Sequence, residues 1–345
     1  MKIGVIGVGL WGRNLVRVIP ESGRGEIKTL CDKSWRALSD LSGRLPGARV
    51  CTDYREVLAD PEIDVVYVAT PPDTHFEIVG AALQARKHVL VEKPLATALD
   101  AASTLVDLAW KVNRVLLVGH TFMYSPPVRR VKDLIDSGAL GQVFYIDSQR
   151  VNLGQVQDSG VVWDLAPHDL SILQYWLGES PVSVYAAGQS YVSEGQEDVA
   201  FITLRYASGI VAQLHLSWLA PTKLRRTTVT GAHRMVVYDD LAGPEAVKIY
   251  DQGVSRIRQP QSFGEFQLTY RTGDIVIPRL DNVEPLRIEW DHFADCVETG
   301  SRPLSGGPEG AEIVRIIEAC RRSLIAGRPQ VLDRPDAGSR AAAVE

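Results

Sequence analysis

A glycine-rich turn opens the sequence. Gly7, Gly9 and Gly12 form the pattern GxGxxG directly after an apolar run over residues 2–7 and at the start of a stretch with helical spacing. Gly7 permits a tight turn, Gly9 lets the backbone approach a pyrophosphate, and Gly12 allows close packing of a helix on a strand. The N-terminus of that helix offers free N–H groups to a phosphate. The turn therefore predicts a dinucleotide site, and a glycine turn without a ligand is the alternative.

An acidic residue further along supports the dinucleotide interpretation. Asp32 ends the apolar run over residues 27–31, 20 positions after Gly12, where a carboxylate can accept the hydroxyls of the adenosine ribose. A carboxylate repels a 2′-phosphate, so Asp32 favours NAD over NADP, although Lys33 could soften that preference. The contacts expected here are Gly7, Gly9, Leu10, Trp11, Gly12, Asp32 and Lys33.

The first third of the chain has the pattern of a doubly wound α/β domain. Short apolar runs, expected as strands, alternate with stretches of helical spacing, which is typical of a parallel sheet covered on both faces. The expected strands are residues 2–7, 27–31, 65–70, 88–92 and 115–119.

The pattern changes after Tyr124. Ser125-Pro126-Pro127 breaks the chain, and alternating runs predict a mainly antiparallel sheet with helices on one side. The expected strands are residues 143–151, 182–189, 200–206, 210–218 and 226–231, with a hairpin at Ser208-Gly209, and helices are expected at 128–137, 285–299 and 308–326. We therefore expect a Rossmann domain over residues 1–124, an α+β domain over 125–331 and a mobile tail over 332–345.

Bulk properties exclude several classes of protein. Apolar residues make up 45% of the chain, charged residues 23%, and the net charge is −5, which gives no basic face for nucleic acid. The four cysteines are scattered and expected to be reduced, and no metal site is expected. The N-terminus lacks the pattern of a signal peptide and no stretch could span a membrane, so a cytoplasmic location is expected.

Three further segments complete a resemblance to a known family. They are ATPPDTH at residues 69–75, VEKPL at residues 91–95 and GVVWDLAPHD at residues 160–169. With the glycine turn, EKP followed by DxxxH resembles the glucose-fructose oxidoreductase, inositol dehydrogenase and MocA family over nearly the whole chain, to about Ala326. The resemblance implies a Rossmann domain followed by an open-faced antiparallel sheet, a site in the cleft between them, and hydride transfer to or from a polyol or sugar carbon.

The resemblance also implies catalytic roles, because Lys93, Asp164 and His168 match residues that line the nicotinamide site. Oxidation of an alcohol needs a base for the hydroxyl proton, and Lys93 and His168 are the candidates. Burial beside a cationic nicotinamide should depress the pKa of Lys93, whose alternative role is to orient the substrate. On a helix, Asp164 and His168 share a face, and the acid could fix the imidazole tautomer. Pro167 complicates a helix here; a capping Asp164 and a structural His168 are the alternative.

Within the family, the chain is similar to members that act on nucleotide sugars, among them UDP-N-acetylglucosaminuronate 3-dehydrogenases. The similarity lies in Arg150-Val151-Asn152-Leu153-Gly154 and in the WDLAPHD run that begins at Trp163. Arg150 and Asn152 could bind a carboxylate, hydroxyl or phosphate of the substrate, and a salt bridge on the sheet surface is the competing interpretation for Arg150.

Residues near these motifs have alternative roles. Thr70 and Pro71 are expected to contact the cofactor, whereas His75 could equally cap the following helix. Tyr124, next to His120 at the end of the last strand of the first domain, could bind a ligand or pack in the core. The full set of expected cofactor contacts from this region is Thr70, Pro71, His75, Glu92 and Lys93, and that of substrate contacts is Lys93, Tyr124, Arg150, Asn152, Trp163, Asp164 and His168.

Two local expectations complete this set. Asp169 is expected to be an exposed helical carboxylate, although it could orient a neighbour. Pro94 is expected to follow a cis peptide bond, since such bonds are largely confined to proline.

The leading hypothesis is an NAD-dependent dehydrogenase that oxidises a ring hydroxyl, at carbon 3 of a nucleotide sugar. The rivals are an NADPH-dependent ketosugar reductase and an inositol or free-sugar dehydrogenase. A non-catalytic dinucleotide-binding sensor is the hypothesis from another class. The resemblance and the open sheet face together predict a homodimer or homotetramer.

Overall fold

The protein consists of two compact units. The computed structural model describes residues 1–45, 47–154, 157–192, 194–256 and 268–332. The first unit comprises Met1–Ser125 and Val283–Arg315, and the second comprises Pro126–Asn282 and Ile316–Glu345. The division near residue 125 lies where the proline pair follows Tyr124, but the segment 283–315, which we had expected in the second domain, groups with the first unit.

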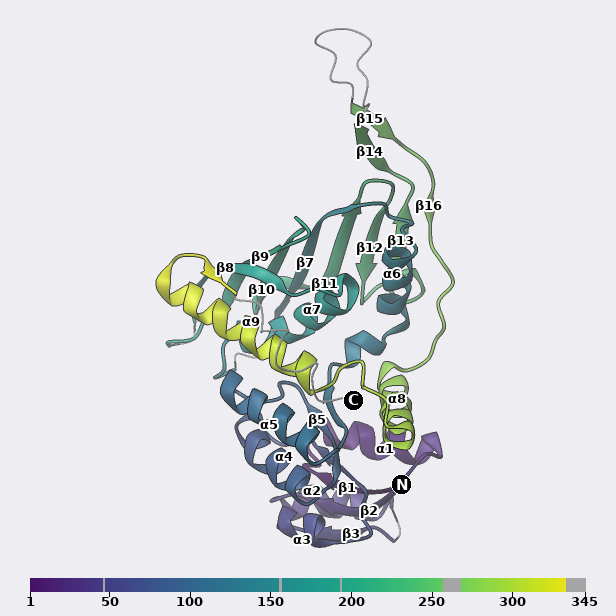
Figure 1. Cartoon of the computed structure of the whole chain (residues 1–345), viewed down its shortest axis with the longest axis vertical. Coiled ribbons are helices and arrows are strands. Elements are labelled where there is room, and N and C mark those ends of the chain that lie inside the picture. The colour runs from purple at the N-terminus through teal and green to yellow at the C-terminus, as the bar shows by residue number, and fades with distance from the viewer. Residues whose placement is uncertain (46, 155–156, 193, 257–267, 333–345) are drawn as a thin grey trace. The chain divides into compact units, whose positions relative to one another are not determined.

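A six-stranded parallel sheet forms the centre of the first unit (Figure 1). Its strand order, β3-β2-β1-β4-β5-β6, is that of a doubly wound fold whose order reverses between β1 and β4. The four residues of β4 are completely buried, as expected when helices cover both faces. The strands are β1 (Lys2–Ile6), β2 (Glu26–Cys31), β3 (Arg49–Cys51), β4 (Val65–Val68), β5 (His88–Glu92) and β6 (Leu116–Gly119).

The helices of this unit include one from late in the chain. Helix α8 (Pro285–Thr299) packs against α1 (Gly12–Ser22). Trp290 and Phe293 of α8 are completely buried in the same core as Ile3 of β1, and the Trp290 indole donates to Ser22 Oγ at 3.0 Å. This packing explains why 283–315 groups with the first unit. The other helices are α2 (Trp35–Ser42), α3 (Tyr54–Ala59), α4 (His75–Gln84) and α5 (Leu99–Lys111), with 3-10 turns η1 (Pro72–Thr74) and η2 (Thr121–Tyr124).

A nine-stranded sheet forms the second unit, in the order β16-β13-β12-β11-β7-β10-β9-β8-β17. All neighbouring pairs are antiparallel except β7 with β10. The predicted hairpin at Ser208-Gly209 joins β9 to β10, and Gly209 adopts a positive φ of 92°. The strands are β7 (Val143–Leu153), β8 (Pro181–Gln189), β9 (Val199–Tyr206), β10 (Val211–Ser217), β11 (Leu219–Gly231), β12 (Met235–Asp239), β13 (Val247–Tyr250), β16 (Ile275–Val276) and β17 (Gln330–Val331).

Helices cover one face of this sheet. Helix α7 (Val161–Leu177) packs against β7, β9 and β10, and α6 (Pro126–Asp136) packs against β12 and β13. Side chains alternate between the faces of a strand, and the uncovered side presents Tyr145, Tyr185 and Phe201, each 40–49% exposed. The remaining elements are the pair β14 (Gly253–Arg256) and β15 (Leu268–Arg271), the turn η3 (Gly243–Glu245), and α9 (Gly307–Ala326), which begins in the first unit and ends in the second. The predicted fold class is confirmed.

Several local expectations change. The short edge strand β3 was not predicted, and β11 begins seven residues before the expected run at 226. Pro167 lies inside α7 rather than in its first turn, and the helix continues through it. The tail over residues 333–345 lies outside the described residues, whereas Leu332 is buried and its N–H donates to the carbonyl of Val182 at 2.8 Å.

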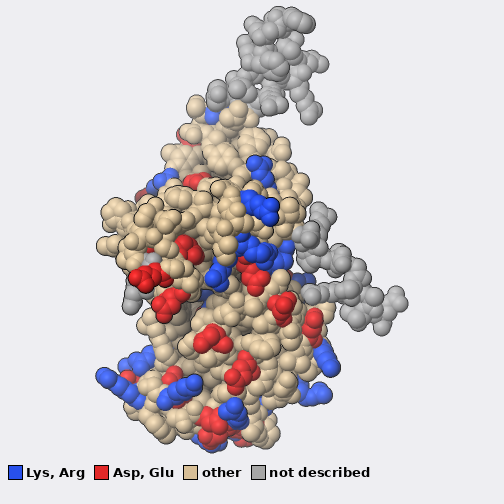
Figure 2. Space-filling model, turned by 90° about the vertical axis from the view of Figure 1, so that its left-hand side faces the viewer, with Lys and Arg blue, Asp and Glu red and all other residues tan. Residues whose placement is uncertain are grey.

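Charged side chains of both signs lie on one face of the molecule. On the face that Figure 2 displays, Lys and Arg side chains are interspersed with Asp and Glu side chains. Among the described residues, no helix has both the length and the apolar character that crossing a membrane requires.

Candidate functional site

The glycine turn between β1 and α1 has the geometry expected for a pyrophosphate. Gly7 adopts φ +91°, and a Cβ there would lie 2.6 Å from the backbone of Ala69; a Cβ on Gly12 would lie 2.1 Å from the Gly7 carbonyl oxygen. A Cβ on Gly9 would meet nothing within 4 Å, so its open side can receive a ligand. Trp11 begins α1 without a side-chain cap, which leaves backbone N–H groups for an anion. The residues present therefore fit a dinucleotide.

Asp32 follows β2 and lies against this turn. Its two carboxylate oxygens accept hydrogen bonds from the backbone N–H groups of Val8 and Ser34, each at 2.8 Å. A carboxylate has about four lone-pair sites, so it can hold the turn and still accept ribose hydroxyls. Leu10, Trp11 and Lys33 are exposed around it.

His75 joins the two loops that follow β4 and β5. Its side chain is completely buried, with Nδ1 at 2.7 Å from the carbonyl oxygen of Pro94 and Nε2 at 2.9 Å from that of Thr70. Burial lowers the pKa of His75. Because both nitrogens face protein carbonyls, His75 has no nitrogen open to a ligand. Its side chain also does not cap α4. It positions the loop of Thr70 and Pro71 relative to the loop of Lys93, whose peptide bond to Pro94 is cis, as predicted.

Two carboxyl groups of the unit that contains Lys93 have raised pKa values. Glu92 accepts a hydrogen bond from the Tyr67 hydroxyl at 2.6 Å, so its carboxylate is engaged in the protein, and burial raises its pKa. Glu289 of α8 is completely buried, accepts from the Thr121 hydroxyl at 3.0 Å, and has a pKa raised well above its usual value by burial and by Glu92. Both groups are therefore biased towards their neutral forms.

His120 directly follows β6 and Tyr124 ends η2, and the two side chains have different surroundings. Tyr124 is completely buried, with its hydroxyl 2.9 Å from Ser305 Oγ, and burial raises its pKa, so core packing is the interpretation that fits. His120 is 1% exposed, and neither ring nitrogen has a hydrogen-bond partner among the described residues. Sequence analysis placed His120 at this edge but assigned it no role.

The DxxxH motif of the second unit lies on α7. Gly160, with φ +83°, precedes the helix, and Glu197 binds its first N–H groups through a backbone oxygen at 2.9 Å and a side-chain oxygen at 3.2 Å. Asp164 is therefore not the cap. Its Oδ2 accepts from the indole of Trp218 at 3.2 Å, while His168 lies one turn later on the same, partly exposed face.

Trp218 was missed by sequence analysis. It is 1% exposed and precedes β11, and a Cβ on Gly154 would lie 3.0 Å from its indole and 2.6 Å from the Asn152 amide. Trp218 thus lies beside two predicted substrate residues, Asn152 and Asp164. Trp163, by contrast, is buried. The parallel pairing of β7 with β10, in which Ser217 lies opposite Val151, and the packing of α7 on both strands bring these residues together. No local pattern in the sequence reports these contacts.

Arg150 and Asp169 form a buried ion pair, and the expectation of an exposed Asp169 is wrong. Arg150 Nε lies 2.8 Å from Asp169 Oδ2, a second guanidinium nitrogen lies 3.2 Å from Oδ1, and Ser148 also donates to Oδ1 at 3.0 Å. The two side chains are 5% and 3% exposed. The geometry fits the salt-bridge interpretation of Arg150, in the core rather than on the sheet surface.

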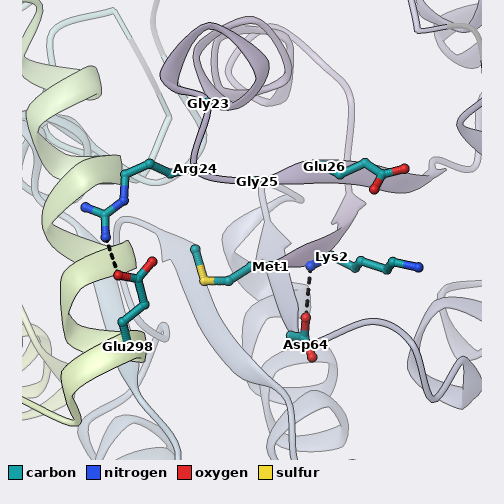
Figure 3. Close-up of a pocket in the computed structure, with 8 residues that line it drawn as sticks. All are labelled: Met1, Lys2, Gly23, Arg24, Gly25, Glu26, Asp64 and Glu298. Atoms are coloured by element: carbon teal, nitrogen blue, oxygen red, sulfur yellow. Dashed lines mark hydrogen bonds and ion pairs between the residues drawn. The ribbon is translucent and has the colours of Figure 1, made fainter.

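One pocket of about 600 Å³ lies elsewhere on the first unit (Figure 3). It adjoins the amino ends of β1 and β2, opposite to the carboxyl edge where open α/β sheets bind ligands. None of the predicted site residues lines it. Its lining consists of Met1, Lys2, Gly23, Arg24, Gly25, Glu26, Asp64 and Glu298. Within the described ranges, no group of three or more His, Cys, Asp or Glu side chains is placed to hold a metal ion.

The strand order, the glycine turn and Asp32 define the first unit as the dinucleotide-binding domain of an NAD-dependent oxidoreductase. The model of an oxidoreductase family with an NAD-binding Rossmann fold matches residues 1–120. The model of the GFO/IDH/MocA C-terminal domain matches residues 128–237. The chain belongs to the GFO/IDH/MocA oxidoreductase family, and the predicted resemblance and cofactor are confirmed.

Individual relatives are distant but cover nearly the whole chain. An uncharacterized oxidoreductase, YrbE of Bacillus subtilis, is 26% identical and aligns with 96% of this chain and 97% of its own length. A myo-inositol 2-dehydrogenase of Thermotoga maritima is 25% identical, over 94% of this chain and 96% of the relative. Among solved structures, the UDP-N-acetylglucosamine 3-dehydrogenase GnnA from Acidithiobacillus ferrooxidans has a TM-score of 0.78 at 24% identity, covering 94% of this chain and 98% of that one.

Proposed function

We propose that the protein oxidises a ring hydroxyl of a sugar to a ketone with NAD, and that the sugar is a nucleotide sugar oxidised at carbon 3. The observation that carries the proposal is the accessible face of α7, where Asp164 is bonded to the Trp218 indole and His168 follows one turn later. The relation to sugar and inositol dehydrogenases supports a polyhydroxylated substrate.

Lys93, Asp164 and His168 would divide the proton chemistry. As the substrate carbon gives up hydride, its hydroxyl must lose a proton, and Lys93 or His168 accepts it. The bound NAD supplies the hydride acceptor. Asp164 is held by Trp218 and can in turn orient His168, since residues four apart on a helix are neighbours.

The first experiment is a turnover screen of UDP-sugars, free hexoses and inositols with NAD and with NADP, followed by nicotinamide absorbance. Turnover of a UDP-sugar supports the proposal, whereas turnover of only a free sugar or inositol removes the nucleotide-sugar assignment. NADH binding without turnover of any of them would favour a sensor.

Variants then separate binding from chemistry. Lys93→Met keeps a side chain of similar length without the amine, and we expect it to lower kcat by about 100-fold or more while NADH still binds. Asp32→Ala should weaken the preference for NAD over NADP. Full turnover by Lys93→Met would overturn its role as a proton acceptor, although the cofactor assignment would stand.

We propose further that the open sheet face of the second unit pairs two subunits in a homodimer, or in a homotetramer built from such pairs. Tyr145, Tyr185 and Phe201 expose apolar rings on this face, and exposed apolar patches commonly mark interfaces. A monomeric mass in light scattering would contradict the proposal, and Phe201→Glu should shift the mass downwards.

A further inference from the structure

His120 lies beside Lys93 at the carboxyl edge of the first unit's sheet. Strands β5 and β6 pair in parallel with Glu92 opposite Gly119, so the next residues, Lys93 and His120, leave the two strands side by side. This is the edge at which ligands of open α/β sheets bind. The positive charge of Lys93 contributes to lowering the pKa of His120, as expected for side chains that leave neighbouring strands.

The imidazole of His120 differs from two other imidazoles of this unit. Both nitrogens of the buried His75 face carbonyl oxygens, and Nε2 of the partly buried His292 accepts from the Leu304 N–H at 2.9 Å. His120 is 1% exposed, yet neither of its ring nitrogens has a partner among the described residues. Buried polar groups are nearly always hydrogen-bonded, so an exception requires an explanation.

The charge state of His120 limits what it can bind. Burial, together with the positive charge of Lys93, lowers the pKa of His120 to about 3. The ring is therefore neutral at physiological pH, with one nitrogen that donates and one that accepts a hydrogen bond. Such a pair is complementary to an uncharged group that can both donate and accept, which describes a primary amide or a hydroxyl.

We propose that His120 is a ligand-binding residue whose neutral imidazole bonds an amide or hydroxyl group next to Lys93. Two groups of the reaction have this chemistry: the carboxamide of the nicotinamide ring and a hydroxyl of the substrate. The second source rests on the proposed sugar substrate, whereas the first rests only on the NAD cofactor.

The test compares His120→Phe, which retains a ring but no nitrogen, with His120→Asn, which keeps one donor and one acceptor. We expect His120→Phe to weaken the binding of NADH or of the substrate at least tenfold. The melting temperature should be unchanged or raised, because an apolar ring replaces a polar ring that has no hydrogen-bond partner among the described residues. His120→Asn should recover part of the lost affinity. Tyr124→Phe is the matched control: it removes the bond to Ser305 in the core, so its melting temperature should fall while NADH affinity is unchanged.

The readouts distinguish the two sources. The carboxamide is identified by two results for His120→Phe. The NADH Kd rises in fluorescence titration, and the variant no longer prefers NADH over the dinucleotide in which an acetyl group replaces the carboxamide. An unchanged NADH Kd with a raised substrate KM identifies the hydroxyl. If His120→Phe does not fold, His120→Asn and the ¹⁵N shift of the wild-type imidazole on addition of NADH or substrate provide the same decision.

Unchanged Kd and KM, with no shift of the imidazole signal, would overturn the proposal. If no sugar is turned over, only the proposed substrate fails. The role of His120 is then decided by the NADH titration and by the imidazole shift on addition of NADH. A changed Kd or a changed shift supports the role, and the absence of both changes overturns it.

Discussion

Removing one partner of the Arg150–Asp169 pair should destabilise the protein severely. Asp169→Ala removes both carboxylate contacts of a guanidinium that is 5% exposed, and it removes one hydrogen bond of the Ser148 hydroxyl. Breaking a buried pair in this way costs about 3–5 kcal/mol, a large part of the roughly 5–15 kcal/mol that folds a typical domain. Replacing both partners with apolar residues, as in Arg150→Met with Asp169→Leu, should restore most of the loss, because no buried charge is left unpaired.

The free energy of unfolding would be measured in urea by circular dichroism, without ligand, for both single variants and the double variant. Glu56→Gln is the control, since it breaks the exposed pair of Arg49 and Glu56 and should cost under about 1 kcal/mol. A loss below about 1 kcal/mol for Asp169→Ala would refute the buried pair and return Arg150 to the list of substrate residues. A double variant as unstable as the singles would refute the argument from charge burial.

Three further outcomes follow from the geometry. Gly9→Ala should have the melting temperature of the wild type but bind NADH more weakly. Gly12→Ala should melt at a clearly lower temperature, because its Cβ would lie 2.1 Å from the Gly7 carbonyl oxygen. Equal melting temperatures of the two variants would contradict the turn geometry. Because the pKa of Glu289 is raised in the folded protein, its contribution to stability falls as pH rises above about 4.5. The gain in unfolding free energy from Glu289→Gln, measured in urea, should therefore grow from about pH 4.5 to about pH 8, and a constant difference would count against this account. His75→Leu should cost about 1–3 kcal/mol of unfolding free energy measured in urea, because it removes the imidazole N–H that donates to the carbonyl of Thr70 or of Pro94, and a neutral effect would remove its positioning role.

Patterns confined to a few residues were predictable from the sequence. The glycine turn, the parallel strands and the hairpin at Ser208-Gly209 each follow from backbone requirements that their own residues reveal. Strand β3 could not be predicted in this way, because its three residues are too few to show a periodic pattern of apolar side chains. The expected ends of β5 and β6 match the structure, whereas β4 ends at Val68, two residues before the expected end at Thr70.

Contacts between distant elements could not be predicted in the same way. Asp169 looked like an exposed helical carboxylate because its partner, Arg150, lies on a strand that meets α7 only in the folded unit. Trp218 carries no motif, although it holds Asp164. Pro167 weakened the expectation of a helix, but the buried side chains of α7 stabilise it beyond what local preference allows.

The return of α8 to the first unit has a consequence for biosynthesis and for engineering. Leu286, Trp290 and Phe293 of α8 complete the core that β1 shares with α1, so a ribosome that has made only residues 1–125 has produced a core that lacks these three side chains. The nascent dinucleotide-binding unit must wait for more than 150 further residues before it can close. A gene fragment that stops after Ser125 should therefore yield an aggregating product, and a fusion that appends the segment 283–315 through a short linker should rescue it.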